Sequence, residues 1–445
     1  MLKQRLTSPD SRLTTWLTAL FALAQTLAYY AYLRNDPGNY NGAGAGGDQV
    51  AYIDLAQQVL YGTWEGAVHY MPGLPAVIAA GQLLTGDPRL GIAVIQAVLY
   101  ALVVVAVARL AGTIFGEGSA PWAAAAVGLN PALGYYASQA LTEFLTAVVL
   151  VAVAATLVAW SRAQSLWRAA LVGVLIGLAG YLRAEYLGLA VLFGLIVLWM
   201  ARARPSKAFA SAAVLVCATL LVIAPWVARY TVTTGRPALY NESPFSNLVL
   251  MGTWFRAFDE QTFATLQQIE TAPGTRDEAI ARAATVGPRP ELSQRYMEQA
   301  RGPYERPLGE TLTLAAQNIQ LNLRQYLVNH LVLAPVLIWA GHTPLRQADA
   351  PRLPSSARYL IWGAEMVLLL LAIWQAVVSL RGPADAQALA LSFLSVVAFL
   401  TLVHIVIAVD ERFTTPALPL IGLLAGARIA QLIRSRQRIA IRYAS

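Results

Sequence analysis

The sequence predicts an all-α protein that crosses a membrane many times. Of its 445 residues, 57% are hydrophobic and 13% are charged, whereas about a quarter of the residues of a soluble domain are charged. Long apolar runs recur along the chain, and several approach the roughly 20 residues that a helix needs to cross the hydrocarbon layer. Lys and Arg fall mostly in short segments between these runs, as in cytoplasmic loops of membrane proteins. We therefore expect a bundle of about 10–11 transmembrane helices.

Seven runs approach the length of a membrane span, and three shorter ones are expected to span where protein or a cavity surrounds them. The long runs are Leu13–Leu33, Leu90–Leu110, Leu141–Trp160, Phe209–Trp226, Tyr359–Leu380, Ala388–Val409 and Phe413–Ile433, and the short ones are Pro121–Tyr136, Ala169–Leu182 and Leu187–Met200.

One further apolar run, Leu327–Trp339, leaves the number of spans open because Asn329, His330 and Pro335 interrupt it. If this run spans the membrane there are eleven helices, and if it lies along the interface there are ten. The ten-helix version places the basic C-terminal tail in the cytoplasm, as the positive-inside rule favours. It also places the arginines between 346 and 358 outside, which the rule disfavours. We favour ten helices.

The charges also indicate how the chain is organised. Lys3, Arg5 and Arg12 precede the first span, so we expect a cytoplasmic N-terminus. Residues 1–228 then form a transmembrane module whose first external loop is 34–72. Residues 229–357 form an external subdomain with interfacial helices, and residues 358–445 form the C-terminal spans and a basic tail. The net charge of +8 is explained by this orientation signal, so we expect membrane lipids and no nucleic acid as partners.

Asp48 in the first external loop is the strongest catalytic candidate. Gly46 and Gly47 free the backbone before it, and the apolar positions between 50 and 59 predict a short helix lying on the membrane. Asp is a favoured helix N-cap, which is a structural explanation for its position. A carboxylate at the lipid–water boundary is also suitably placed to deprotonate an acceptor that attacks a lipid-borne sugar.

Short motifs follow one another in a fixed order relative to the spans. The first motif begins in the first external loop and consists of Asp48, Tyr52, Leu55, Ala56, Leu60, Gly62, Pro72, Gly73 and Pro75. The second is Asn130-Pro131 with Tyr136, Ser138, Thr142 and Glu143, and the third is Gly177–Glu185. The fourth is Pro225-Trp226 with Arg229, Tyr230 and Gly235, and the last is Asp410-Glu411-Arg412-Phe413 with Pro416 and Pro419. In this order and spacing the chain resembles the C-type (GT-C) glycosyltransferases. It is most similar to their bacterial branch of protein O-mannosyltransferases and aminoarabinose transferases.

The resemblance implies a GT-C-like helical bundle that moves a sugar from a polyprenyl-phosphate donor to a lipid, glycan or protein acceptor. It also implies a multi-pass protein of the inner (cytoplasmic) membrane whose active site faces the periplasm or outside. Two positions depart from the family pattern. Phe413 stands where tyrosine is usual, and Asp48-Gln49 stands where the mannosyltransferases carry Asp-Glu. The second departure argues against a strict protein mannosyltransferase.

The implied reaction is an inverting single displacement with Asp48 as the base, while Glu143 positions the acceptor or shares a proton or metal. Arginine suits the phosphate leaving group because its guanidinium stays charged and binds phosphate through two parallel hydrogen bonds. Donor-binding candidates are Arg183, Arg412, Tyr52 and His69, and acceptor or pocket candidates are Glu185, Tyr240, Asn247 and Glu411. The structural alternative is that the arginines snorkel or pair with Glu185 or Glu411, and that Glu143 makes a structural hydrogen bond.

No glycine-rich loop for a nucleotide phosphate occurs, which fits a lipid-linked donor. His69 and His404 are possible metal ligands, but neither a tight histidine spacing nor a dense carboxylate cluster accompanies them, so we expect no required cofactor and do not favour a divalent metal. Two other classes stay open: a transporter or flippase of lipid-linked sugars, and a polysaccharide ligase or polymerase. The lack of a convincing internal repeat and the acidic residues at outer span ends favour the transferase.

Overall fold

The computed structural model describes residues 11–34, 47–62, 70–235, 237–238, 242–303, 306–341, 354–407 and 409–444. Within these ranges the regular structure is helical and contains no strand. The chain divides into two compact units. We call Met1–Leu239, His342–Leu400 and Glu411–Ser445 the bundle unit, and Tyr240–Gly341 with Thr401–Asp410 the insert unit.

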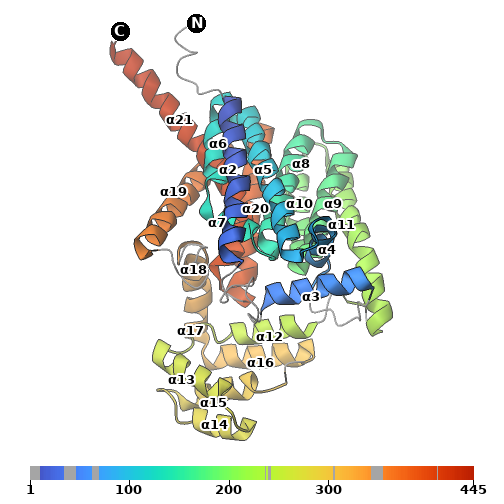
Figure 1. Cartoon of the computed structure of the whole chain (residues 1–445), viewed down its shortest axis with the longest axis vertical. Coiled ribbons are helices and arrows are strands. Elements are labelled where there is room, and N and C mark those ends of the chain that lie inside the picture. Colours follow the sequence, from blue (N-terminus) through green and yellow to red (C-terminus); the bar gives the residue numbers. More distant parts are fainter. Residues whose placement is uncertain are drawn as a thin grey trace. The chain divides into compact units, whose positions relative to one another are not determined.

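Each of the ten predicted apolar runs is helical in the structure (Figure 1). The corresponding helices are α2 (Ser11–Leu33), α5 (Pro88–Phe115), α6 (Ala120–Gly128), α7 (Pro131–Ala137), α8 (Thr142–Ala163), α9 (Leu166–Leu182), α10 (Leu189–Met200), α11 (Pro205–Thr234), α19 (Ser355–Ser379), α20 (Ala384–Ile407) and α21 (Leu418–Ala444). In the described part of the chain, six helices are long and apolar enough to cross a membrane, and the apolar α9 and α10 are shorter. The chain is therefore a multi-pass membrane protein.

The predicted run Pro121–Tyr136 is divided into α6 and α7 at Asn130-Pro131. Pro131 has no N–H to continue a helix, and it occupies the first turn of α7, where none is needed. The Asn130 side chain accepts a hydrogen bond from the Leu133 N–H at 3.1 Å and so caps the new helix. The break leaves room for a loop that leads into α8.

The helix predicted in the first external loop is α3 (Asp48–Tyr61), which lies across one end of the bundle (Figure 1). The capping explanation for Asp48 is wrong, because Gly47 is the N-cap and the Asp48 side chain makes no capping bond. Gly47 adopts φ +141°, a conformation that favours glycine, and this sets the direction in which α3 leaves the loop. The Asp48 carboxylate is thus free for other contacts.

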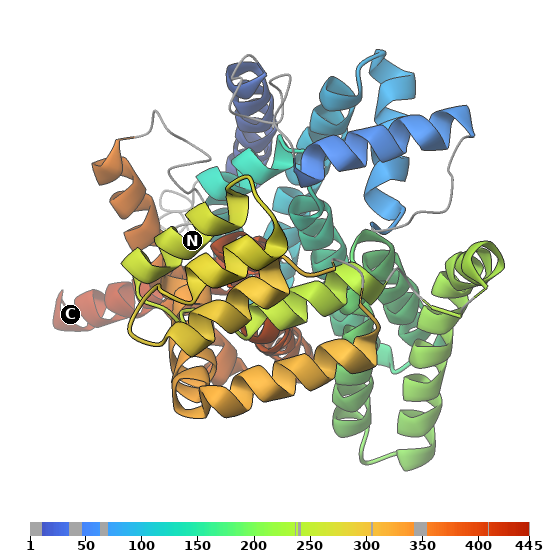
Figure 2. The same ribbon diagram turned by 90° about the horizontal axis from the view of Figure 1, so that it is seen from below.

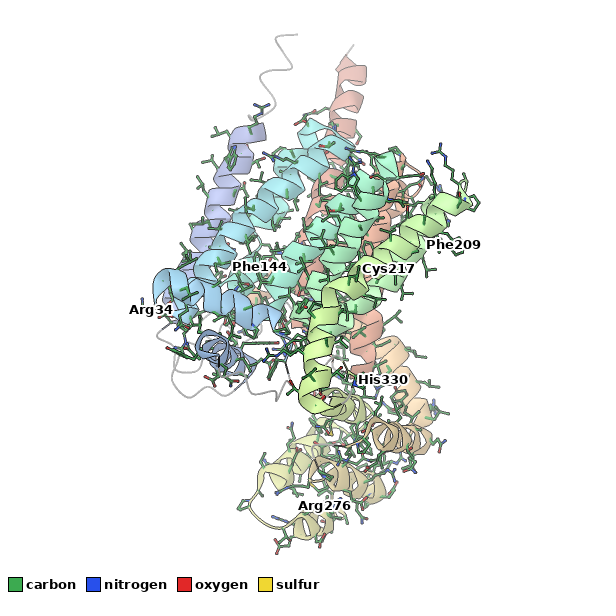
Figure 3. All side chains as sticks on the ribbon, turned by 90° about the vertical axis from the view of Figure 1, so that its right-hand side faces the viewer. Arg34, Phe144, Phe209, Cys217, Arg276 and His330 are labelled. Carbon is green, nitrogen blue, oxygen red and sulfur yellow. The ribbon has the colours of Figure 1, made fainter. Side chains whose placement is uncertain are left out.

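Small residues let helices of the bundle unit approach closely. The short apolar helix α4 (Gly73–Thr85) packs on α5 with Gly81 against Gly91, and a Cβ atom added at Gly81 would lie 2.6 Å from the carbonyl carbon of Gly91. Gly426 of α21 packs in the same way on α6, where an added Cβ would lie 2.5 Å from the Cα of Ala123. Close backbone approach of this kind supplies packing contacts between membrane helices. Buried Phe144 of α8 and exposed Phe209 and Cys217 of α11 mark the inside and outside of this unit in Figure 3.

The insert unit is made of shorter helices, several of which lie side by side in Figure 2. They are α12 (Glu242–Gly252), α13 (Glu260–Thr271), α14 (Arg276–Ala283), α15 (Pro290–Ala300), α16 (Leu308–Leu321), α17 (Leu323–Val328) and α18 (Ala334–Ala340). Trp254, Leu266, Tyr296 and Met297 belong to its buried core. The ambiguous run Leu327–Trp339 forms the end of α17, a π-helical turn (Asn329–Leu333) and most of α18.

The α4–α5 contact gives the first testable prediction. Gly91→Ala forces the two backbones apart, so it should destabilise the protein by about 1–3 kcal/mol, as overpacking of a tight interface does. The measurement is the thermal unfolding midpoint in detergent micelles. The matched control is Gly194→Ala in α10, because no neighbouring atom lies within 4 Å of an added Cβ there. Equal midpoints for the two variants would show that the Gly81–Gly91 contact does not hold these helices together.

Candidate functional site

Asp48 at the start of α3 contacts residues from distant parts of the chain. Its Oδ1 accepts a hydrogen bond from the Tyr70 hydroxyl at 3.0 Å. Its Oδ2 accepts one from an Arg412 Nη2 group at 3.2 Å, across 364 positions of sequence. The Asp48 side chain is 40% exposed, so the carboxylate is fixed by two donors and remains accessible to a substrate.

Glu143 is the second residue of α8 and lies close to both candidate arginines. Its side chain is only 3% exposed, and its Oε1 lies 3.7 Å from Nε of Arg412 and 3.9 Å from Nη1 of Arg183. Its Oε2 is buried and has no hydrogen-bond partner among the described residues. A buried carboxylate is costly unless it is paired. Glu143 therefore holds the two guanidinium groups together and keeps one oxygen for another partner.

Arg183 follows the last residue of α9. Its Nε donates a hydrogen bond of 2.5 Å to Glu185 Oε1 in the next turn, as the structural alternative expected. Burial lowers the pKa of Arg183, but the surrounding Glu185, Tyr186, Glu143 and Tyr52 together raise it by more, so it lies above its usual range. The guanidinium therefore stays charged.

The Phe413 ring lies close to both arginines. Its ring centroid is 4.8 Å from the guanidinium carbon of Arg183 and 5.0 Å from that of Arg412. Both distances are within the range of cation–π attraction. The ring is buried and offers both guanidinium groups an apolar surface. The residue that departs from the family pattern is thus part of the arginine cluster.

Gln49 and Gln96 fix the segment that leads into α8. The Ala140 N–H donates to Gln49 Oε1 at 3.1 Å, which ties this segment to α3. Gln96 of α5 donates to the Gln139 carbonyl oxygen at 2.7 Å from the other side. Gln49, the second departure from the family pattern, therefore helps to set the position of Glu143 relative to Asp48.

Tyr52 packs beneath this cluster, one turn along α3 from Asp48. Its ring meets that of Tyr70 edge to face, with centroids 4.7 Å apart. Burial raises the pKa of the Tyr52 hydroxyl well above its usual range, so the phenol stays neutral. Tyr52 therefore supports Tyr70, which in turn donates to Asp48.

The structure thus brings together six of the residues predicted from the sequence, Asp48, Tyr52, Glu143, Arg183, Glu185 and Arg412. Of the others, Asn247 lies on α12 in the insert unit. His69, Tyr240 and the Glu411 side chain lie outside the described residues.

Sequence reasoning missed the roles of Tyr70 and Phe413. Tyr70 immediately precedes the Met71-Pro72-Gly73 turn, and that proximity to a motif was the one signal available for it. No group of three His, Cys, Asp or Glu side chains that would hold a metal occurs in the part of the chain that the structure describes.

A cavity of about 400 Å³ lies within the bundle unit. Its lining is mainly apolar and comes from α3, α4, α9 and α11, with Tyr181, Trp226 and Arg229 among its residues. Tyr181 donates to the Val222 carbonyl oxygen at 3.0 Å, close to Pro225, which interrupts the hydrogen bonding of α11. The cavity therefore combines an apolar wall with the cation of Arg229.

No protein-family model matches the chain, and no curated protein matches it. Among solved structures it is similar to the oligosaccharyltransferase AglB of the archaeon Archaeoglobus fulgidus, in complex with an inhibitory peptide and a dolichol-phosphate. That match has a TM-score of 0.56 and 14% identity, and it covers 98% of this chain and 52% of the other. A structure of the A. fulgidus oligosaccharyltransferase in complex with Zn and sulfate matches with a TM-score of 0.55 and 14% identity. This match covers 97% of this chain and 50% of the other.

The chain spans about half the length of these oligosaccharyltransferases. ArnT from Cupriavidus metallidurans, bound to undecaprenyl phosphate, matches at 15% identity over 92% of this chain and 76% of the other, with a TM-score of 0.39, below the level that indicates a shared fold. The similarity to the oligosaccharyltransferase extends over nearly the whole chain. In its described residues the chain is all-α, as the sequence predicted, and it shares its fold with the A. fulgidus oligosaccharyltransferase.

Proposed function

We propose that this protein is a glycosyltransferase that moves a sugar from a polyprenyl-phosphate donor to a lipid, glycan or protein acceptor. The observation that carries the proposal is the cluster of Asp48, Glu143, Arg183 and Arg412 around Phe413. Its place is the cytoplasmic membrane, with the active site on the outer side. That side follows from the cytoplasmic N-terminus expected from the basic residues before α2.

The two arginines suit the leaving group of the donor. In the structure both guanidinium groups are balanced by carboxylates, and a donor phosphate would compete with these carboxylates for the same N–H donors. The A. fulgidus oligosaccharyltransferase, with which the chain shares its fold, was solved with a dolichol-phosphate. The apolar cavity beside Tyr181 offers space for the first isoprene units of such a lipid. These features together support a lipid-phosphate donor.

Asp48 suits the role of general base in a single displacement. It accepts the proton of the acceptor nucleophile while that atom forms a bond to the anomeric carbon of the sugar. The bond between this carbon and the phosphate oxygen breaks on the opposite face, and the phosphate leaves as an anion held by Arg183 and Arg412. The Tyr70 and Arg412 donors keep Asp48 oriented for this proton transfer.

Glu143 suits the role of holding both arginines while it orients the acceptor through its unpartnered Oε2. This division of roles requires no cofactor. A transporter or flippase would instead place charged side chains in broken helices near mid-membrane, whereas Asp48, Glu143 and Arg183 all lie at or beside helix ends. Neither this class nor a ligase or polymerase is favoured by a specific contact of the described residues.

The role of Asp48 can be tested with Asp48→Asn, which keeps the size of the side chain and removes the base. Transfer should fall by about 100-fold or more, the usual contribution of a general base. Transfer is measured with the purified protein in nanodiscs and a panel of synthetic undecaprenyl-phosphate sugars. Asp54→Asn is the matched control, because Asp54 is an exposed carboxylate on the same helix. Normal transfer by Asp48→Asn, with the control equally active, would refute the base assignment.

The role of Phe413 can be tested with the pair Phe413→Leu and Phe413→Tyr. Leucine removes the aromatic face shared by the two guanidinium groups, at a cost of about 0.5–2 kcal/mol for each contact, whereas tyrosine keeps the face. The KM for the lipid-phosphate donor should rise several-fold with leucine and stay near its original value with tyrosine. An unchanged donor KM in Phe413→Leu would show that the ring does not set the arginine pair.

A further inference from the structure

The insert unit contains a cavity of about 800 Å³ that the proposed reaction does not use. This volume lies within the usual range of small-molecule sites, roughly 300–1,000 Å³. All of its lining residues belong to the insert unit. Its lining includes aromatic and aliphatic side chains, among them Phe255, Phe258, Phe263 and Leu333. Its rim carries Arg256, Asp259, Glu260 and Gln325.

One wall of the cavity is held in place by a buried hydrogen-bond network. Trp254 Nε1 donates to Gln299 Oε1 at 2.9 Å, and Asn318 Nδ2 donates both to that oxygen at 2.8 Å and to Thr253 Oγ1 at 2.9 Å. Arg295 Nε donates to Asn318 Oδ1 at 2.8 Å. The network anchors the segment after α12 to α15 and α16, so the pocket is formed before a ligand arrives.

Arg256 is held in a backbone conformation that glycine would adopt more easily. Its φ is +49°, in the left-handed region. The buried amide of Asn329, in the π-helical turn, fixes this geometry by donating to the carbonyl oxygens of Phe255 at 2.9 Å and Arg256 at 3.0 Å. Such strain is found preferentially at functional sites, as are π-helical turns. The Arg256 guanidinium is exposed at the rim and has no side-chain partner among the described residues.

The rim offers both hydrogen-bond acceptors and donors beside aromatic rings. Asp259 is fixed there because its carboxylate caps α13, accepting from the Thr262 N–H and hydroxyl at 2.8 Å each. Glu260 is exposed beside it, and Gln325 faces the same cavity. Carboxylates accept hydrogen bonds, whereas guanidinium and amide groups donate them, so the rim can match groups that do both.

We propose that this cavity binds a sugar ring of the acceptor. A pyranose has apolar C–H faces that stack on aromatic rings and hydroxyl groups at its edge that both donate and accept hydrogen bonds. A polyprenyl chain could contact the aromatic rings but could not hydrogen-bond to the polar groups of the rim, which disfavours a lipid occupant. Sugar binding by the cavity stands on its own contacts, and its assignment to the acceptor rests on the proposed glycosyltransferase function. The acceptor is then a glycan or a glycolipid.

The proposal is tested by direct binding, without the transfer reaction. The full chain in nanodiscs is titrated with chitotriose, mannotriose and maltotriose, and binding is followed by saturation-transfer NMR and isothermal titration calorimetry. At least one trisaccharide should bind. Arg256→Gly, which relieves the backbone strain and removes the guanidinium, should weaken it at least tenfold without lowering the thermal midpoint. Phe263→Ser, at a side chain that is 37% exposed, should also weaken binding. Arg324→Ala, an exposed arginine of α17, is the control and should bind normally.

The outcomes separate this proposal from the proposed function. If none of the sugars binds, or if the Arg256→Gly and Phe263→Ser variants bind as well as the unaltered protein, the sugar site is overturned. Binding of an unglycosylated peptide at this cavity in place of the sugars overturns it as well. Asp48→Asn should keep full trisaccharide affinity while transfer is lost. Sugar binding by a protein that transfers no sugar from any lipid-phosphate donor would contradict the glycosyltransferase function and leave the sugar site intact.

Discussion

The site depends on two guanidinium groups that lie close together in a largely buried place. Arg183 and Arg412 each lie within cation–π distance of the Phe413 ring, and Glu143 lies within 4 Å of both. The Glu143 carboxylate offsets the repulsion between the two positive charges, and the Phe413 ring attracts both guanidinium groups. Asp48 in turn accepts a hydrogen bond from the Nη2 group of Arg412. The candidate base is thereby linked to the groups that would hold the leaving phosphate.

The helices of the bundle unit bring these residues together. They come from α3, α8, the end of α9 and the segment before α21. Glycine contacts such as Gly81–Gly91 let the helices approach, and Gln49 joins the start of α3 to the segment that enters α8. Helix packing and hydrogen bonds near helix ends, such as that from Ala140 N–H to Gln49, therefore determine together where the side chains of the site lie.

The fold was predictable because the apolar runs are long and the solvent of the chain is lipid. Four charged residues of the site could also be singled out from the sequence. Glu143, Arg183 and Arg412 stand at the ends of such runs, and Asp48 begins the short helix of the first external loop. Phe413 and Tyr70 were not, because their roles depend on contacts between segments far apart in sequence and no local pattern encodes those contacts. The run Pro121–Tyr136 was predicted as one span, and the break at Asn130-Pro131 was not predicted. A proline preceded by a capping residue was the local sign of it. The sugar pocket likewise depends on the strained Arg256 and the π-helical turn at Asn329, which composition does not reveal.

The central claim is that Asp48 and the arginine cluster carry out one direct displacement at the anomeric carbon. The most direct measurement is the anomeric configuration of the product, determined by NMR after transfer from an undecaprenyl-phosphate sugar of known configuration. A single displacement forms the new bond on the face opposite the phosphate, so the account predicts a fully inverted product. A product that retains the configuration of the donor would require a covalent intermediate and two displacements, and it would contradict the account.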